Sequence, residues 1–192
     1  MIGHMLCIIG YIDEFLTKDF FSAVRDPKYL DNIFINNDYG QKFWISSPGG
    51  DVGYMISMFD YIRHGKAKTV TIASGIVQSA AAVLLQSGSV RKMTRNSFLV
   101  FHPPQKQSIP RKDDPSKTTE EISEKEWSLY TLLAGLVADR CGLTLIEAYD
   151  LFDGTFISAE KAKQIGLIDE IIDPKIIPVV QPIFGDGDGP ID

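Results

Sequence analysis

Short runs of apolar and β-branched residues recur along the chain and alternate with segments in which apolar residues follow a helical period. Four of these runs have the length of a buried strand, and they lie at residues 6–10, 42–47, 69–74 and 97–102. Helical periodicity marks residues 17–34 and 52–64, and within residues 75–88 the run of small and apolar residues that Ser79 heads predicts a buried helix. Strands that alternate with helices indicate a parallel sheet joined by right-handed crossovers. The pattern therefore predicts an α/β fold.

The pattern changes in the second half of the chain. Residues 103–117 are rich in proline and charge, and they predict an exposed, mobile loop instead of a strand. Thr118 and Glu121 have the spacing of a capping box, which predicts a long helix over residues 118–140 that Gly142 ends. Apolar residues fall on two stripes of this helix, Leu129, Leu133 and Leu136 on one and Trp127, Tyr130, Ala134 and Val137 on the other. Because one neighbouring layer needs only one stripe, we expect the helix to pack against a second subunit as well as its own.

Two shorter helices are expected after it. The first covers residues 143–152, and the second begins after the capping residue Ser158 and ends at Gly166. A last short strand is expected within residues 167–172.

The chain has 192 residues, which is enough for one domain with a sizeable core. We expect that domain to span residues 6–173. Residues 174–192, with their prolines, glycines and acids, predict a poorly ordered tail. Residues 1–5 could be in part the remnant of a cloning tag before a native start at Met5.

Charge and cysteine content exclude several classes of protein. The formal net charge of −6 argues against a nucleic-acid surface. Cys7 and Cys141 lie far apart without metal-type spacing, which predicts reduced thiols in a cytoplasmic protein. No apolar run reaches the roughly 18 residues that a membrane span needs, and no secretory signal begins the chain. We therefore expect a soluble protein without a membrane, nucleic-acid, metal or cofactor partner.

Three places could carry chemistry. Gly49 and Gly50 lie between a strand and a helix, so their turn can bring bare backbone amides close to a ligand, although a tight connecting turn explains them equally. Ser79 precedes Ala80 at the expected start of a helix, where it is either a capping serine or a nucleophile beside unpaired amides. His102 ends a strand, at the edge where α/β proteins place reactive groups, and it is the best candidate for a general base or else a structural histidine.

The segments SSPGGDV (46–52), GIVQSAAA (75–82), NSFLVFHPP (96–104) and FISAEKAKQIGLIDEII (156–172), taken in this order, resemble the Clp-type serine peptidases, the ClpP family. The resemblance covers roughly Leu6 to Asp173, nearly the whole chain. It implies a ClpP/crotonase-like fold with a protruding handle helix, stacked homo-oligomeric rings, and hydrolysis of peptides or unfolded proteins without a cofactor. Carried over by position, it implies Ser79 as nucleophile, His102 as general base, and the amides of Gly50 and Ala80 as oxyanion hole.

The resemblance is less direct for the third residue of the triad. In the family an Asp precedes the Phe of the Phe-x-Ser-Ala motif by two positions, whereas Gly154 holds that place here and Asp153 comes one residue earlier. A one-residue shift of the loop would restore the carboxylate. We therefore expect Asp153 to orient His102, with Asp150 as the substitute; the alternative is a surface Asp that begins an Asp-Gly turn.

Two further departures bear on partners. The first strand starts near Leu6, without the axial segment that ClpP subunits present to a ring ATPase, so the resemblance leaves dependence on such an ATPase open. Residues 103–117 contain prolines and no glycine where the family has a Gly-rich strand that pairs with substrate and with the facing ring. These departures leave a non-catalytic ring subunit as the main alternative to a peptidase. An acyl-CoA enzyme of the crotonase type is a further alternative, which has no need of a serine nucleophile.

Overall fold

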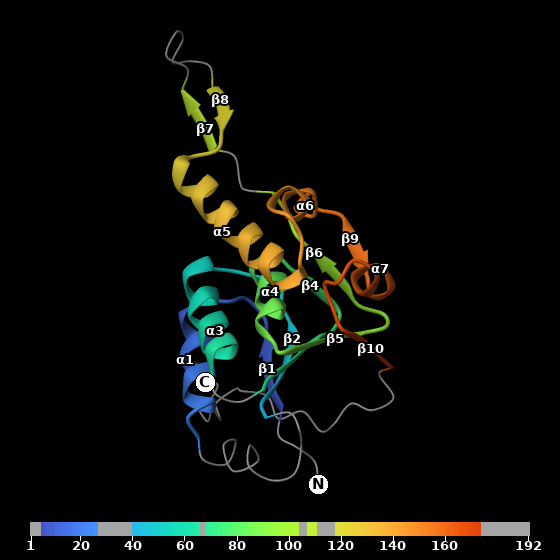
Figure 1. Cartoon of the computed structure of the whole chain (residues 1–192). Helices are drawn as coiled ribbons and strands as arrows, with labels where there is room; N and C mark the ends of the chain where they lie inside the picture. Colours follow the sequence, from blue (N-terminus) through green and yellow to red (C-terminus); the bar gives the residue numbers. More distant parts are fainter. Residues whose placement is uncertain (1–4, 27–39, 66–67, 104–106, 111–117, 174–192) are drawn as a thin grey trace, which may run out of the picture.

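A five-stranded parallel sheet forms the centre of the protein (Figure 1). The computed structural model describes residues 5–26, 40–65, 68–103, 107–110 and 118–173. The strands of the sheet, in spatial order, are β1 (Met5–Ile9), β2 (Lys42–Ser46), β3 (Val70–Ala73), β5 (Val90–Thr94) and β10 (Glu170–Ile172). All neighbouring pairs in it are parallel, which confirms the predicted fold class.

Strand β5 was not predicted, because Arg91 and Lys92 interrupt its apolar pattern. The strand is nevertheless central, and Arg91 is buried in it. Its guanidinium donates to the Asp169 carboxylate through Nη2 at 2.7 Å and Nε at 3.1 Å, and the Arg91 amide donates to the same carboxylate at 2.7 Å. A buried charge is tolerated when it is paired in this way.

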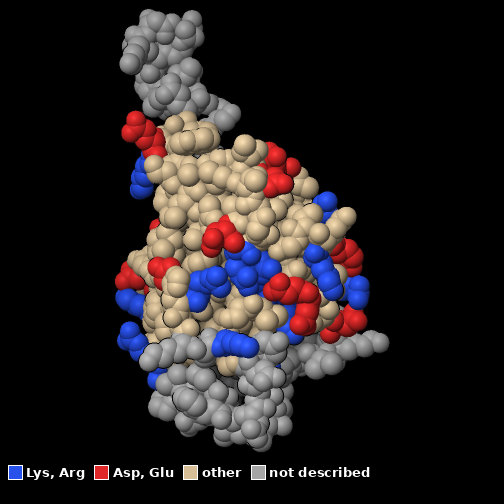
Figure 2. Space-filling view, viewed as in Figure 1, with Lys and Arg blue, Asp and Glu red and all other residues tan. Residues whose placement is uncertain are grey.

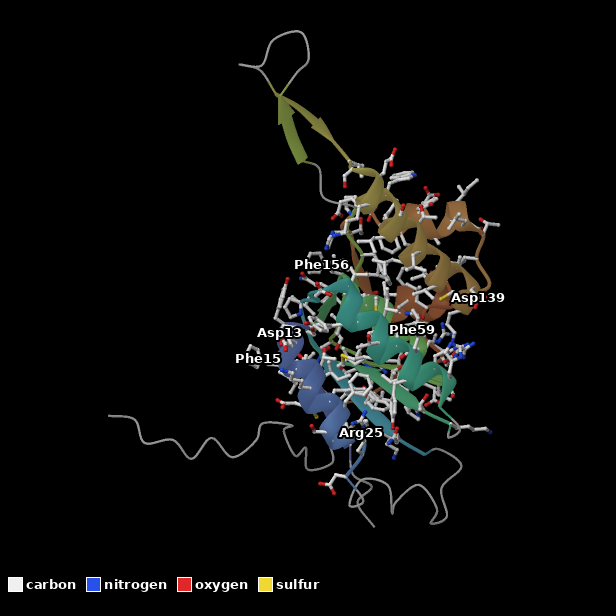
Figure 3. The ribbon with its side chains drawn as sticks, turned by 90° about the vertical axis from the view of Figure 1, so that its left-hand side faces the viewer. Asp13, Phe15, Arg25, Phe59, Asp139 and Phe156 are labelled. Atoms are coloured by element: carbon white, nitrogen blue, oxygen red, sulfur yellow. The ribbon has the colours of Figure 1, made fainter. Side chains whose placement is uncertain are left out.

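Two helices pack side by side against the sheet (Figure 1). Helix α1 (Glu14–Ala23) is capped by Asp13, and α3 (Val52–His64) by Asp51, and each cap accepts backbone amides of the first turn. The predicted period of α3 is confirmed, since its buried residues are Met55, Met58, Phe59 and Ile62. Figure 3 shows Phe59 within the packed interior, while Phe15, which is 74% exposed, projects from the start of α1.

Residues 76–87 form a strand that was not predicted, then a junction at Ser79, and then the helix that was expected to start there. Strand β4 (Ile76–Gln78) joins β6 (Phe98–Val100) and β9 (Phe156–Ser158) in a second, smaller sheet. Helix α4 (Ala80–Leu84) then runs into a 3₁₀ turn, η2 (Leu85–Ser87). The β-branched pair Ile76 and Val77 forms parallel pairs with Phe98 and Leu99, as residues of this kind favour strands.

Two expectations for the middle of the chain were wrong. Residues 107–110 are not loop: β7 (Gln107–Pro110) pairs antiparallel with β8 (Thr118–Glu121), and this hairpin projects from the body (Figure 1). The residues expected to cap the long helix therefore lie in a strand, which suits a segment that begins with two threonines. Helix α5 (Glu124–Cys141) begins at Glu124, because Ser123 accepts the Glu126 amide at 3.2 Å. Its left-handed end at Gly142 is as predicted.

The C-terminal helices agree with the sequence pattern. Helix α6 (Leu145–Asp150) opens with a capping box of Thr144 and Glu147, and α7 (Ala159–Gln164) is capped by Ser158, as predicted. The expectations for residues 1–4 and 174–192 lie outside the described residues and stay predictions.

Candidate active site

Ser79 occupies a strained junction between β4 and α4. Its φ of 53° and ψ of −128° make it the one non-glycine residue with positive φ in the described part of the chain. The Ser79 amide donates to the Val100 carbonyl at 2.8 Å, and its carbonyl accepts from Ala82 and Val83. Its hydroxyl makes no capping hydrogen bond to α4, so the structure does not support the capping interpretation. Strain of this kind costs about 1–3 kcal/mol, and it persists where the surroundings enforce it and the side chain serves a purpose.

The Gly49–Gly50 turn passes directly beside Ser79. A Cβ on Gly49 would lie 2.8 Å from the Cβ of Ser79, and one on Gly50 would lie 2.2 Å from the Ile12 carbonyl oxygen, so only glycine fits at either position. Three hydrogen bonds hold the turn. Ile12 donates its amide to the Gly49 carbonyl, Asp51 donates to the Ile12 carbonyl, and Gly49 donates to the hydroxyl of Ser47. Within the described residues, the Gly50 amide forms no hydrogen bond and is open to a ligand.

His102 follows β6 and presents an exposed imidazole. Its Nδ1 lies 2.9 Å from the carbonyl oxygen of Pro103. A carbonyl only accepts, so this contact places the proton on Nδ1 and leaves the lone pair on Nε2. That tautomer is the one in which Nε2 can take a proton from a hydroxyl.

Ser79, His102 and Gly50 line one cavity of about 510 Å³. This volume is typical of a ligand site. Helix α5 supplies one wall, and Tyr11, Pro48, Asp51 and Val52 supply the side near the glycine turn. The first amides of α4, that of Ala80 included, have no partner within their helix and add positive potential beside Ser79. The structure thus brings together the hydroxyl, the imidazole and the glycine turn that the sequence singled out.

Asp153 is not part of this arrangement. It is exposed, it does not line the cavity, and its carboxylate accepts the Thr155 amide at 2.7 Å. Hydrogen bonding from the Thr155 side chain and then from the Thr155 amide lowers the pKa of Asp153. The turn is nevertheless close to the histidine along the backbone, because the Gly154 amide donates to the carbonyl of Phe101 at 2.8 Å. Asp150 is exposed at the end of α6 and does not line the cavity.

Three groups at the site were missed by sequence reasoning. The Pro103 carbonyl contacts His102, the Ser47 hydroxyl holds the glycine turn, and an aromatic pair backs the cavity. In that pair, the ring of Phe152 meets the ring of Tyr130 edge to face at 5.2 Å. Only Ser47 carried a sequence signal, because it immediately precedes the Pro-Gly-Gly turn. In the described residues, no group of three or more His, Cys, Asp and Glu side chains could hold a metal ion, and no helix could cross a membrane.

The comparisons with known proteins agree with this arrangement. The Clp protease family model matches residues 30–175, which is more than half of the chain. The chain belongs to the Clp protease family. The ATP-dependent Clp protease proteolytic subunit of Bacteroides fragilis is 29% identical over 147 residues, which are 75% of this chain and 68% of that protein. Proteolytic subunit 1 of Gloeobacter violaceus is 28% identical over 167 residues, 82% of this chain and 81% of that protein.

A solved Clp structure supports the same assignment. The ClpP protease catalytic domain from Plasmodium falciparum matches with a TM-score of 0.69 and 25% identity, over 92% of this chain and 89% of that one. In a second strain of B. fragilis and in B. thetaiotaomicron, the match spans 64% of the relative's length. The predicted family, fold class and Clp-type peptidase class are therefore confirmed. The crotonase-type alternative finds no support in these relatives.

Proposed function

We propose that the protein is a Clp-type serine endopeptidase that cleaves peptides or unfolded polypeptides through an acyl-enzyme on Ser79. The observation that supports the proposal is the strained backbone of Ser79, whose hydroxyl does not cap α4 and which lines the same cavity as His102 and Gly50. Strained serines between a strand and a helix are typical of nucleophiles in α/β hydrolases.

Each residue has a defined task in this mechanism. Nε2 of His102 takes the proton of Ser79 as its Oγ attacks the scissile carbonyl, and the imidazolium then gives that proton to the leaving amine. The amides of Gly50 and Ala80 stabilise the oxyanion, and the loss of one such donor raises the barrier by about 3 kcal/mol. Water then attacks the ester with the same histidine as base. The products are an acid and the free enzyme.

In the described conformation, the Pro103 carbonyl takes one role expected of Asp153, which is to accept a hydrogen bond from His102. It accepts from Nδ1 of His102 and fixes the tautomer, although it brings no negative charge to stabilise the imidazolium. For Asp153 to replace it, the turn would have to release the Thr155 amide. We propose Asp153 as the orienting carboxylate only after such a rearrangement.

The test is covalent labelling of the full-length protein with a fluorophosphonate probe. We expect a stoichiometric adduct on Ser79 by peptide mass mapping, and no adduct in Ser79→Ala. The matched control is Ser57→Ala, which removes a serine hydroxyl elsewhere, on α3, and should be labelled as wild type is. Absence of any adduct on Ser79, under conditions in which trypsin is fully labelled, would contradict the proposal.

A second candidate is a non-catalytic ring subunit, which the position of Asp153 favours. Its carboxylate is held by Thr155, so a full triad is not assembled in the described conformation. Turnover of casein or of quenched peptides distinguishes the two. Hydrolysis that Ser79→Ala abolishes excludes the non-catalytic reading, whereas labelling without hydrolysis supports it.

We further propose homo-oligomeric rings, in the cytoplasm, with a Clp ATPase as a possible partner for unfolded substrates. Four large apolar side chains support the oligomer, because Trp127, Leu132, Leu145 and Ile146 on α5 and α6 are 41–73% exposed. Figure 2 shows that the part of this face over α5 and α6 carries few charges, while charged side chains gather lower down. Patches of this kind mark protein interfaces. Free thiols at Cys7 and Cys141 are consistent with a reducing compartment.

A further inference from the structure

Helix α5 lines the cavity with a stripe of side chains that is mostly apolar and has a carboxylate at one end. Glu126, Leu129, Tyr130 and Leu133 all face the cavity, and their spacing of three, four and seven residues places them on one side of the helix. At a rise of 1.5 Å per residue, the stripe is about 10 Å long from Glu126 to Leu133. The wall is therefore apolar along most of its length and ends in a carboxylate.

Among the described residues that line the cavity, Glu126 is the carboxylate without a partner. Asp51 is the other carboxylate among the lining residues, and its Oδ1 accepts the amides of Gly53 and Tyr54. The Glu126 carboxylate, in contrast, forms no hydrogen bond or ion pair with a described residue, although the side chain is half-buried. Neither lysine nor arginine lines the cavity among the described residues.

Glu126 lies in the first turn of α5, where the helix dipole complements an acidic side chain. A carboxylate held in this way beside Leu129 and Tyr130 has lost part of its hydration without gaining a partner. A cation that enters the cavity would supply one, and a charge-assisted hydrogen bond in such a place is worth more than a neutral one.

We propose that the cavity selects a substrate residue with a long aliphatic stem and a cationic end, that is, a lysine or an arginine near the scissile bond. The methylene groups pack on Leu129 and Leu133, and the ammonium or guanidinium meets Glu126. Glu126 is then a specificity-determining residue. This inference rests on the proposed peptidase function, because it names the substrate class of the same site.

The test uses internally quenched octapeptides in which lysine, norleucine or glutamate is moved through the six central positions. Norleucine keeps the aliphatic stem and lacks the charge. We expect the full-length protein to prefer lysine over norleucine about tenfold in kcat/KM at one position, which mass spectrometry of the products identifies. Glu126→Gln should bring this ratio close to one. The matched control is Glu124→Gln, in the same turn but exposed and outside the cavity lining, which should leave the ratio unchanged.

The outcomes separate this inference from the proposed function. Hydrolysis with no lysine preference, or with a preference that Glu126→Gln leaves intact, overturns the inference and leaves the peptidase standing. If no peptide is hydrolysed, the fluorescent peptides are titrated against Ser79→Ala and against the Ser79→Ala, Glu126→Gln double variant. The inference is supported, even without peptidase activity, if Ser79→Ala binds the lysine peptide more tightly than the norleucine peptide and the double variant does not. Equal binding of lysine and norleucine peptides, or none of either, overturns it.

Discussion

Replacing Gly49 with alanine tests whether the glycine turn and Ser79 form one unit. Gly49 has a φ of 97°, a conformation that side chains rarely adopt. The added Cβ would lie 2.8 Å from the Cβ of Ser79, 2.9 Å from the Gln78 carbonyl oxygen and 3.1 Å from the Ala80 amide nitrogen. These neighbours are backbone or Cβ atoms, so none can swing away as a flexible side chain would.

The magnitude follows from two contributions. The positive φ alone costs an alanine about 1–3 kcal/mol of folding free energy. Relief of the contact with Ser79, from 2.8 Å to an ordinary 3.4–4 Å, requires the turn to move by about 1 Å relative to Ser79. A misplacement near 1 Å at a reacting group lowers the rate about 100-fold. We therefore expect Gly49→Ala to lose 1–3 kcal/mol of stability and about two orders of magnitude in labelling rate at Ser79.

Urea unfolding and the rate of fluorophosphonate labelling measure the two effects. The control is Gly135→Ala, within α5, where an added Cβ meets no atom within 4 Å. That variant should keep the labelling rate and gain up to about 1 kcal/mol, because alanine is the better helix former. If Gly49→Ala has the wild-type free energy of unfolding and the wild-type labelling rate, the turn does not constrain Ser79, and the two do not form one unit.

Three further predictions concern charged and thiol groups. Burial alone would raise the pKa of Asp169, but the hydrogen bonds and the charge of Arg91 outweigh burial and lower that pKa. The pair therefore stabilises the fold above about pH 4, and this stabilisation is lost as the pH falls through the lowered pKa. Asp169→Asn should therefore cost about 1–2 kcal/mol in urea unfolding at pH 7, because solvent screens the 38% exposed carboxylate, with a smaller difference from wild type below pH 4, and a difference independent of pH would contradict this. Asp153→Asn should slow labelling of Ser79 less than tenfold, since its carboxylate contacts Thr155; a loss near 10⁴-fold would instead show that the turn rearranges onto His102. Burial raises the pKa of Cys7 to about 11, so iodoacetamide at pH 8 should modify Cys7 only in denaturant, and rapid modification of the folded protein would show that β1 opens.

The parts of the fold that the sequence predicts are those in which local pattern and tertiary packing agree. Helix α3 is an example, since its apolar period, its capping Asp51 and its buried face coincide. Strand β5 escaped prediction because Arg91 is neutralised by Asp169, 78 residues further along the chain. A pairing at that distance has no local signal.

The residues of the candidate site could likewise be predicted where a local sequence pattern marks them, and not where a distant contact decides their position. Ser79, His102 and Gly50 could be named because each follows a strand with turn or helix signals around it, and strand ends meet at one edge. The position of Asp153 could not be predicted, because it depends on whether its carboxylate binds the Thr155 amide two residues on or a ring more than 50 positions back in the chain. The start of α5 was misplaced for a related reason: Ser123 and Thr118 both suit a cap, and pairing between β7 and β8 decides between them.

Helix α5 contributes both to the wall of the cavity and to the exposed apolar surface. Glu126 and Leu129 line the cavity, while Trp127, between them in sequence, is 51% exposed, and its ring lies 5.4 Å from the ring of the cavity residue Tyr130. Because a helix moves largely as a rigid rod, a neighbour that presses on Trp127 also shifts the wall that a substrate side chain touches. In the proposed oligomer, a contact at Trp127 would therefore affect substrate choice without any change in the residues that perform the chemistry.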